Sequence, residues 1–411
     1  MSNMNDSGVE WIGEIPYTWK CCKQKYVIRL INGRAYSDNE FEEDGKYRVL
    51  RVGNLFSNPT WYTSSLELPD DKFCINGDLL YSWSMSYAPV IWQGEKVIYH
   101  YHIWKVKLFD ELDTFFAFYY LKSLTEALRA EIHETTMGFI TMGIMNNSYI
   151  AFPSKNNQKK IATYLNRKCS EIDALTADIQ RQIETLEEYK RSVITEAVTK
   201  GIDPNAEMKD SGVEWIGDVP DHWGIMRGKY ILRCLNKPIY EDDGVITCFR
   251  DGEVTLRSNR REDGFTMADK EIGYQGIDIG DLVVHGMDGF AGSIGISDSR
   301  GKASPVLNVL DTKQNKRYIM YYLRSMAYND VFIALATGIR VRSCDLRWNK
   351  LSELLYPLPP LEEQEAIVKY IDSVLERINA IISDKKQQIE TLEEYKKSLI
   401  FEYVTGKKEV I

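Results

Sequence analysis

Two blocks of this sequence each occur twice, far apart in the chain. Residues 6–19 read DSGVEWIGEIPYTW and residues 210–223 read DSGVEWIGDVPDHW, so ten of the fourteen positions are identical. The nonapeptide QIETLEEYK occupies residues 182–190 and again residues 388–396. A period of roughly 200 residues is too long for a solenoid and suits a domain with a connecting element. Because the sequence between the blocks differs, we expect two modules with a common framework and different tasks.

Length and composition are typical of a globular protein with several domains. The 411 residues, 44% hydrophobic and 27% charged, suffice for two or three domains with their own cores. The chain has no apolar run long enough to span a membrane, and its first ten residues lack the features of a signal peptide. We therefore expect a cytoplasmic protein. Seven cysteines without a CxxC pair and five histidines without metal spacing favour reduced thiols and no metal site.

The charge pattern restricts where nucleic acid could bind. A net charge of −9 argues against a generally basic nucleic-acid coat, but it leaves room for local basic grooves. Residues 155–168 carry five basic and no acidic residues, and residues 317–350 carry six basic and two acidic residues. Such runs are more often a solvated surface than a binding site, so both interpretations stay open.

Two long segments have apolar residues at steps of three and four, the pattern of a helix with one buried stripe. Neither contains Gly or Pro before Gly201 and Gly406, where we expect the helices to end. Each helix would have about 40 residues and a length of roughly 60 Å. The stripe of one copy is the obvious partner for the other, which predicts an antiparallel coiled coil. The predicted seam comprises Ile161, Leu165, Cys169, Ile172, Leu175, Ile179, Ile183, Leu186, Tyr189, Val193 and Ala197 with Ile367, Ile371, Leu375, Ile378, Ile381, Ile389, Leu392, Tyr395, Leu399 and Tyr403.

The segments before each helix are rich in short aromatic and β-branched runs between Gly, Asn and Asp turns, and each has one helical stretch, near residues 113–133 and 316–336. We predict an α+β fold in which two similar mixed α/β domains are separated by two long antiparallel helices, with a pseudo-two-fold axis within the chain. The expected boundaries are 1–155 (first domain), 156–201 (first helix), 202–358 (second domain) and 359–411 (second helix). The helices would then act as a ruler between two recognition domains.

The repeated blocks resemble those of a known family. The segments VEWIGEIPYTW and VEWIGDVPDHW are similar to the starts of target-recognition domains in the specificity subunit of type I restriction–modification enzymes. Residues 357–372, PLPPLEEQEAIVKYID, resemble the family's entry into its second conserved helix, and both repeats that contain IETLEEYK resemble its helix ends. The first helix departs from this pattern, because AFPSKNNQKKI replaces PLPPLEEQEAI and only the Pro, the Gln and the apolar positions agree.

The resemblance implies a function. Each target-recognition domain would read one half of a bipartite, asymmetric site in double-stranded DNA, and the helices would set the spacing and dock two methyltransferase subunits. Two motor-nuclease subunits would join them. S-adenosylmethionine, ATP and Mg²⁺ would belong to those partners, so this chain would need no cofactor and would be a non-catalytic subunit of a prokaryotic host-defence complex.

Motifs for chemistry within this chain are weak. Residues 295–303, GISDSRGKA, have the wrong glycine spacing for a phosphate-binding loop and end in Ala303, where Ser or Thr should hold Mg²⁺. The tripeptide EYK at residues 188–190 and 394–396 matches the end of a nuclease motif, but it lies in the predicted helical seam rather than on strands that gather a metal. No Asn or Asp precedes a Pro-Pro-aromatic step, so any base flipping belongs to a partner.

Direct readout of DNA requires Arg, Lys, Asn or Gln at base edges, with most other contacts on phosphate. The alternative for each candidate is an ordinary surface residue. The candidates are Lys46, Arg48, Arg51, Thr141, Asn146, Asn147, Lys155, Lys159 and Lys160 in the first half and Arg250, Arg257, Asn259, Arg260, Arg261, Arg340, Arg342 and Arg347 in the second. The main alternative function is a coiled-coil scaffold that binds only protein partners, which would leave no sequence-selective footprint on DNA.

Overall fold

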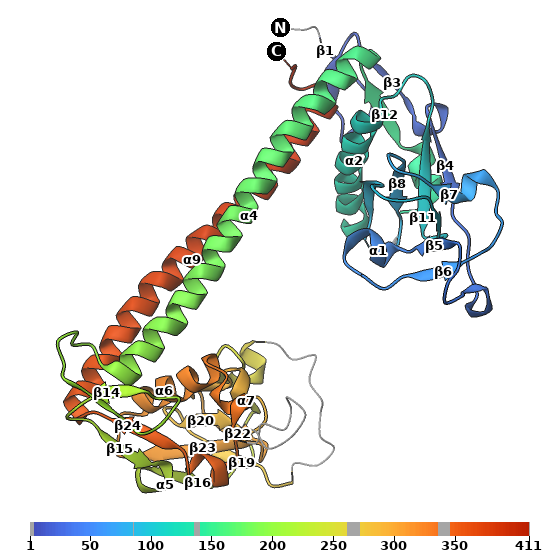
Figure 1. Ribbon diagram of the computed structural model, residues 1–411. Coiled ribbons are helices and arrows are strands. Elements are labelled where there is room, and N and C mark those ends of the chain that lie inside the picture. The colour runs from blue at the N-terminus through green and yellow to red at the C-terminus, as the bar shows by residue number, and fades with distance from the viewer. Residues whose placement is uncertain (1–3, 85, 135–139, 261–271, 336–345, 411) are drawn as a thin grey trace. The chain divides into compact units, whose positions relative to one another are not determined.

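The computed structural model describes residues 4–84, 86–134, 140–260, 272–335 and 346–410. The chain forms two compact units, one of residues 1–179 and 387–411 and the other of residues 180–386. Each of the two long helices, α4 (Lys155–Lys200) and α9 (Leu361–Val404), is divided between the two units (Figure 1). Among the described helices, none combines the length and apolar character needed to cross a lipid bilayer.

Unit 1 contains a mixed α/β globule with two four-stranded sheets (Figure 1). One sheet has the order β4-β11-β8-β9 and the other the order β6-β5-β10-β7. Two smaller antiparallel pairs join β1 to β2 and β3 to β12. The strands are β1 (Met4–Asp6), β2 (Glu14–Pro16), β3 (Lys20–Lys23), β4 (Ile28–Asn32), β5 (Tyr47–Leu50), β6 (Tyr62–Ser64), β7 (Phe73–Cys74), β8 (Leu79–Ser82), β9 (Ala88–Ile91), β10 (Val97–Tyr99), β11 (Ile103–Leu108) and β12 (Tyr149–Phe152). The helices are α1 (Val52–Phe56), α2 (Thr114–Glu134) and α3 (Met142–Asn147).

Unit 2 repeats this plan. Its four-stranded sheet has the order β16-β23-β20-β21, which matches β4-β11-β8-β9 strand for strand. The strands are β13 (Met208–Asp210), β14 (Asp218–Pro220), β15 (Gly224–Arg227), β16 (Leu232–Leu235), β17 (Ile246–Cys248), β18 (Val254–Leu256), β19 (Gln275–Ile277), β20 (Leu282–His285), β21 (Ile294–Ile296), β22 (Gly301–Ala303), β23 (Leu307–Thr312) and β24 (Leu355–Leu358). The helices are α5 (Gly228–Ile231), α6 (Lys316–Tyr328), α7 (Val331–Ala334) and α8 (Trp348–Leu351). Two similar α/β domains are therefore confirmed.

The helix of each globule starts at a side-chain cap. The carboxylate of Asp113 accepts the backbone N–H groups of residues 115 and 116, and the amide oxygen of Asn315 accepts those of residues 317 and 318. The predicted helix near residues 316–336 is shorter than expected. It ends at Tyr328, and the chain turns at Asp330, whose φ of 56° is left-handed, before α7 begins. Asn and Asp favour such a break because their side chains compete for backbone hydrogen bonds.

A buried glutamine forms the junction between each globule and its long helix. The Gln158 side chain accepts the backbone N–H of Asp113 (2.8 Å) and donates to the carbonyls of residues 111 and 153. Gln364 accepts the N–H of Asn315 (2.9 Å) and donates to the side chain of Gln314 and to the carbonyl of residue 359. The two junctions thus have matching geometry, although most of their other residues differ.

The repeated blocks at residues 6–19 and 210–223 explain how each long helix ends. Gly201 and Gly406 follow the helices with φ values of 77° and 75°, a conformation that favours glycine. Gly201 lies against Trp223 in unit 2, and Gly406 lies against Trp19 in unit 1. Each glycine also lies against the proline that ends the second strand of a hairpin, β13–β14 or β1–β2. The two glycines therefore end the helices, as the sequence predicts.

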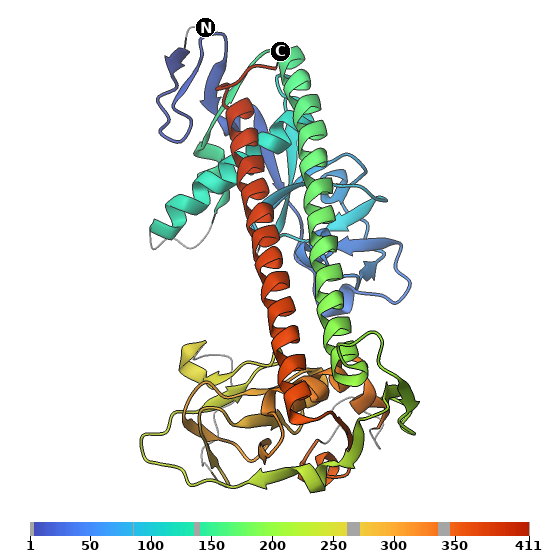
Figure 2. The ribbon, with the colours of Figure 1, turned by 90° about the vertical axis from the view of Figure 1, so that its left-hand side faces the viewer.

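Within each unit, α4 and α9 lie side by side and run antiparallel (Figures 1 and 2). In unit 1 the rings of Tyr164 and Tyr403 are 4.6 Å apart, and Lys396 forms an ion pair with Asp173. In unit 2 Lys385, which takes the place of an isoleucine in the seam of the other copy, donates to Gln182. The antiparallel helix pair is thus confirmed inside both units.

Most predicted seam residues are buried, but the phase of the stripe was wrong at two of them. Buried positions are Ile161, Leu165, Ile172, Ile179, Ile367, Ile371 and Ile378, and half-buried positions are Leu186, Ile389 and Leu392. Leu175 and Ile381 are 49% and 46% exposed. The next residues, Thr176 and Ile382, take their places, because the stripe steps by four and then three residues here, not by three and then four. Tyr189 and Tyr395, also assigned to the seam, are 53% and 52% exposed.

The junction glutamine provides a first test. Replacing Gln158 with Ala leaves buried backbone groups without hydrogen-bond partners, so we expect a loss of about 2–4 kcal/mol in the free energy of unfolding. The exposed Gln180→Ala on the same helix is the matched control and should change stability by less than about 0.5 kcal/mol. Urea denaturation of both full-length variants makes the comparison. Equal stability of the two variants would show that this junction is not a structural requirement.

Candidate nucleic-acid interface

In unit 1, two strand ends and one loop meet at an edge of the globule. The backbone N–H of His100, in the loop between β10 and β11, donates to the carbonyl of Leu50 at the end of β5 (2.9 Å). The N–H of Trp83, just after β8, donates to the carbonyl of His102 (3.2 Å). These bonds place Arg51, which follows Leu50, and Trp83 beside the loop. We call this edge the strand-end site of unit 1.

Rings fill the strand-end site of unit 1. The ring of His100 lies 4.4 Å from that of Tyr101 and 4.8 Å from that of His102, measured between centroids. Trp83 meets His102 edge-on at 5.2 Å. Burial, and then the nearby His102 and Arg51, lower the pKa of His100 to about 4, so the ring is neutral at pH 7. This face offers rings and the guanidinium of Arg51, which suits contacts with apolar or weakly polar base edges.

Unit 2 has the same backbone arrangement with smaller side chains. The N–H of Gly286, just after β20, donates to the carbonyl of Val306 (2.8 Å), which matches the bond between Trp83 and His102. By this correspondence, residues 304–306 (Ser-Pro-Val) replace the His-Tyr-His loop, and a glycine replaces the tryptophan. A cavity of about 780 Å³ lies at this position, with Ser304 among its lining residues.

Three arginines line the cavity of unit 2: Arg250, Arg257 and Arg260. The Arg250 guanidinium pairs with Asp288 (3.1 Å). Arg260 donates to both oxygens of Asp251 and lies 4.2 Å from the centroid of the Phe249 ring. Arg257 donates from Nε to the hydroxyl of residue 247 (3.4 Å). Guanidinium groups at the end of a sheet are suited to phosphate and to the acceptor edge of guanine.

A histidine and a serine add two further groups to this cavity. Burial lowers the pKa of His285. The carboxylate of Asp288 raises this pKa and the charge of Arg250 lowers it, and the net lowering leaves the ring neutral at pH 7. Its Nδ1 accepts the backbone N–H groups of residues 287 and 288, so we infer that Nε2 carries the proton. The buried hydroxyl of Ser293 has no hydrogen-bond partner among the described residues. Because Asp251 and Asp288 also line the cavity, its wall combines hydrogen-bond donors with carboxylate acceptors.

The structure brings together several of the candidates named from the sequence. In unit 2, Arg250, Arg257 and Arg260 line one cavity. Arg347 lies beside it, since the N–H of the preceding Leu346 donates to the carbonyl of Gly286 (2.8 Å). Asn259 instead binds the hydroxyl of residue 255 and supports the local turn. The candidates Arg261, Arg340 and Arg342 lie outside the described residues.

In unit 1 only Arg51 among the candidates lies at the strand-end site. Lys46, just before β5, forms an exposed ion pair with Glu67 (3.2 Å). Arg48, within β5, forms an exposed ion pair with Glu95 (3.3 Å). Such exposed pairs are weak and can exchange for phosphate. Their role in DNA contact stays a prediction.

The remaining candidates of unit 1 lie near α3 and the start of α4. Thr141 caps α3, because its hydroxyl accepts the N–H of residue 144, and Asn147 donates to the carbonyl of residue 143. Asn146 is half-buried. Lys155 donates to the carbonyl of residue 110 (2.9 Å), whereas Lys159 and Lys160 extend from the first turns of α4 as exposed side chains.

Sequence reasoning missed Trp83, His100, Tyr101, His102, His285 and Ser293. The run VIYHYHIW contained a usable signal, because two histidines and a tyrosine interrupt a run that otherwise suits buried strands. No comparable pattern marks His285 or Ser293. They reach the cavity only because β20 and β21 pair with each other in the central sheet.

The comparisons with known proteins point to one family. A family model described as the type I restriction modification DNA specificity domain matches residues 16–185 and 277–391. The MjaVIII specificity subunit of a type I restriction enzyme from Methanocaldococcus jannaschii is 24% identical over 96% of this chain and 93% of that protein. The EcoBI specificity subunit from Escherichia coli is 21% identical over 88% of this chain and 82% of that protein.

A solved structure shows the same fold. It concerns complex assembly and conformational transition of the type I R-M system, and one of its chains superimposes with a TM-score of 0.67 at 13% identity. The match covers 96% of this chain and 99% of that chain.

The lowered pKa of His100 predicts that the folded protein loses stability as the pH falls below neutrality. Between about pH 6.5 and 4 the unfolded chain binds a proton that the folded chain does not, so the free energy of unfolding falls as the pH falls through this range. We expect His100→Phe, which keeps a ring at this position, to reduce that dependence. Urea denaturation of the wild type and the variant at pH 7, 6 and 5 measures it. Parallel curves for the two proteins would contradict the assignment of a neutral, half-buried imidazole.

Proposed function

Because the chain belongs to the type I restriction–modification DNA specificity family, we propose that its two globules read the two halves of a bipartite, asymmetric site in double-stranded DNA. One observation carries this proposal. The strand-end sites occupy the same position in two matching folds, yet one is filled by rings and the other is a cavity lined with arginines. A constant framework with different faces is what recognition of two unlike half-sites requires.

The repeated helices support the assignment of partners. Two methyltransferase subunits would dock on the helix repeats, one for each copy, and two motor-nuclease subunits would complete the complex. In this assignment the chain is a non-catalytic subunit in the cytoplasm of a prokaryotic cell. The partners supply catalysis and bind S-adenosylmethionine, ATP and Mg²⁺. The alternative of a scaffold without DNA contact is not favoured, because the matched family is defined by DNA specificity.

The cavity arginines give a direct test of DNA contact. Replacing Arg250 and Arg257 with Ala removes up to two phosphate or base contacts from one half-site. We expect the assembled methyltransferase to bind its DNA about 10–100-fold more weakly, with a salt slope reduced by up to about 2. Arg377→Ala, an exposed arginine on α9 whose guanidinium donates to Ser373 of the same helix, is the matched control. Unchanged affinity and slope in the double variant would exclude these arginines from the interface.

A second test concerns spacing. Inserting one heptad after Ile179 in α4 and one after Lys386 in α9 keeps the phase of the seam and lengthens each helix by about 10 Å. If the helices set the gap between half-sites, that gap should grow by about three base pairs at roughly 3.4 Å each. Sequencing of methylated sites reads the gap directly. Seven residues inserted in the exposed turn at residues 57–60 serve as the control and should leave it unchanged. The spacer role would be refuted by an unaltered gap in the helix variant.

A further inference from the structure

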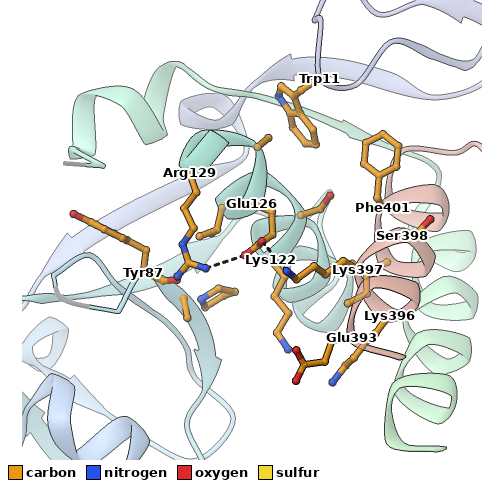
Figure 3. Close-up of a pocket in the computed structure, with 16 residues that line it drawn as sticks. Trp11, Tyr87, Lys122, Glu126, Arg129, Glu393, Lys396, Lys397, Ser398 and Phe401 are labelled. Atoms are coloured by element: carbon orange, nitrogen blue, oxygen red, sulfur yellow. Dashed lines mark hydrogen bonds and ion pairs between the residues drawn. The ribbon is translucent and has the colours of Figure 1, made fainter. Parts of the chain in front are cut away.

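A cavity of about 650 Å³ in unit 1 lies between α2 of the globule and the last turns of α9 (Figure 3). Its apolar lining includes Trp11, Pro89, Ile400 and Phe401. Charged side chains surround the same space: Lys122, Glu126 and Arg129 from α2, and Glu393, Lys396 and Lys397 from α9. We call it the helix cavity of unit 1.

Unit 2 has a counterpart of about 570 Å³ between α6 and the last turns of α4. The long helix lines it with Glu187, Lys190, Arg191 and Ile194. These are the positions that precede Glu393, Lys396, Lys397 and Ile400 by 206 residues, the offset of the repeated nonapeptide. Arg324 of α6, which corresponds to Lys122, lines the cavity from the globule side, together with Arg250 and Asp251, which also line the arginine-lined cavity described above. One helix motif therefore builds a cavity in each unit.

Helix packing alone does not explain why this motif is repeated so closely. All nine residues of QIETLEEYK are identical in the two copies, whereas only five of the 21 positions in residues 161–181 match those in residues 367–387. The identity includes the half-exposed tyrosines Tyr189 and Tyr395 and the exposed Glu188 and Glu394. Exposed side chains that stay the same while buried seam positions change point to a surface used twice.

The charges of the unit 1 cavity favour an acidic occupant. Its lining holds four cationic and two acidic side chains in a chain whose net charge is −9. No carboxylate of the described residues lies within ion-pair distance of Lys122, whose Nζ instead lies 4.7 Å from the centroid of the Phe118 ring. Burial, and then the charge of Lys396, lower the pKa of Lys122. Lys396 already pairs with Asp173, so a carboxylate that entered here would supply the counter-charge that Lys122 lacks.

We propose that the two helix cavities are equivalent docking sites, each of which receives an acidic segment with apolar side chains from one methyltransferase subunit. This inference rests on the partners assigned above and adds where and by what chemistry they bind. The apolar walls at Trp11, Ile400 and Phe401 suit a protein segment. A sugar-phosphate backbone has no apolar side chains to cover these walls, which makes nucleic acid the poorer occupant.

Charge reversal at the cavity rims tests the proposal in the full-length chain. Lys397→Glu alters unit 1 and Arg191→Glu alters unit 2, and both side chains are exposed, so neither change should disturb folding. Lys386→Glu, an exposed lysine of α9 that lines neither cavity, is the matched control. Native mass spectrometry counts the methyltransferase subunits bound to each variant. A photo-cross-linking residue at position 398, which lines the cavity of unit 1, identifies the segment that enters it.

We expect two methyltransferase subunits on the wild type and the control, one on each single variant and none on the double variant. One of the two sites should weaken by about tenfold or more in each single variant. The cross-link should map to an acidic segment of the methyltransferase. Two subunits bound to the double variant would overturn the proposal and leave the proposed function intact, as would normal assembly with weakened DNA binding. A wild-type chain that binds no methyltransferase subunit would instead refute the proposed function itself.

Discussion

A buried glutamine at the start of each long helix is the contact on which the architecture depends. Gln158 and Gln364 satisfy backbone groups of the loop before the globule helix and of the turn before the long helix. An unpaired buried amide costs free energy, so this network favours a single orientation of each globule relative to its long helix. The same network occurs in both units although the surrounding residues differ. Each unit therefore presents its strand-end site from an equivalent support.

The equivalent supports allow the reading faces to diverge. Trp83 and the His-Tyr-His loop occupy in unit 1 the space that Gly286 and Ser-Pro-Val leave open in unit 2. Neither exchange affects the sheet order, since the changed residues lie beyond the strand ends. Under the proposed function, half of the specificity can thus change without loss of the helix pair. The separation of framework from reading face is the physical reason why the repeated blocks are similar and the intervening sequence is not.

The duplicated blocks and the three-four spacing predicted the two domains, the antiparallel helices and the glycines that end them, because these features follow from local periodicity. The exact phase of the seam could not be predicted from local periodicity. Leu175 and Thr176 both lie near the stripe, and only packing selects which of them lies in the seam. The strand-end sites were only partly predictable. Arg51, Arg250 and Arg257 were found from their chemistry, but His100 and His285 reach the sites through strand pairings that the sequence pattern does not specify.

The central claim is that one framework supports two interchangeable reading faces. The most direct measurement replaces the segment between β15 and β24 with a second copy of the segment between β3 and β12. Single-molecule sequencing of modified bases then compares the sites methylated in cells that carry the original or the exchanged chain with its methyltransferase. We predict that the exchanged chain directs methylation to sites built from two copies of one half-sequence. Continued methylation of the original asymmetric site would contradict the account.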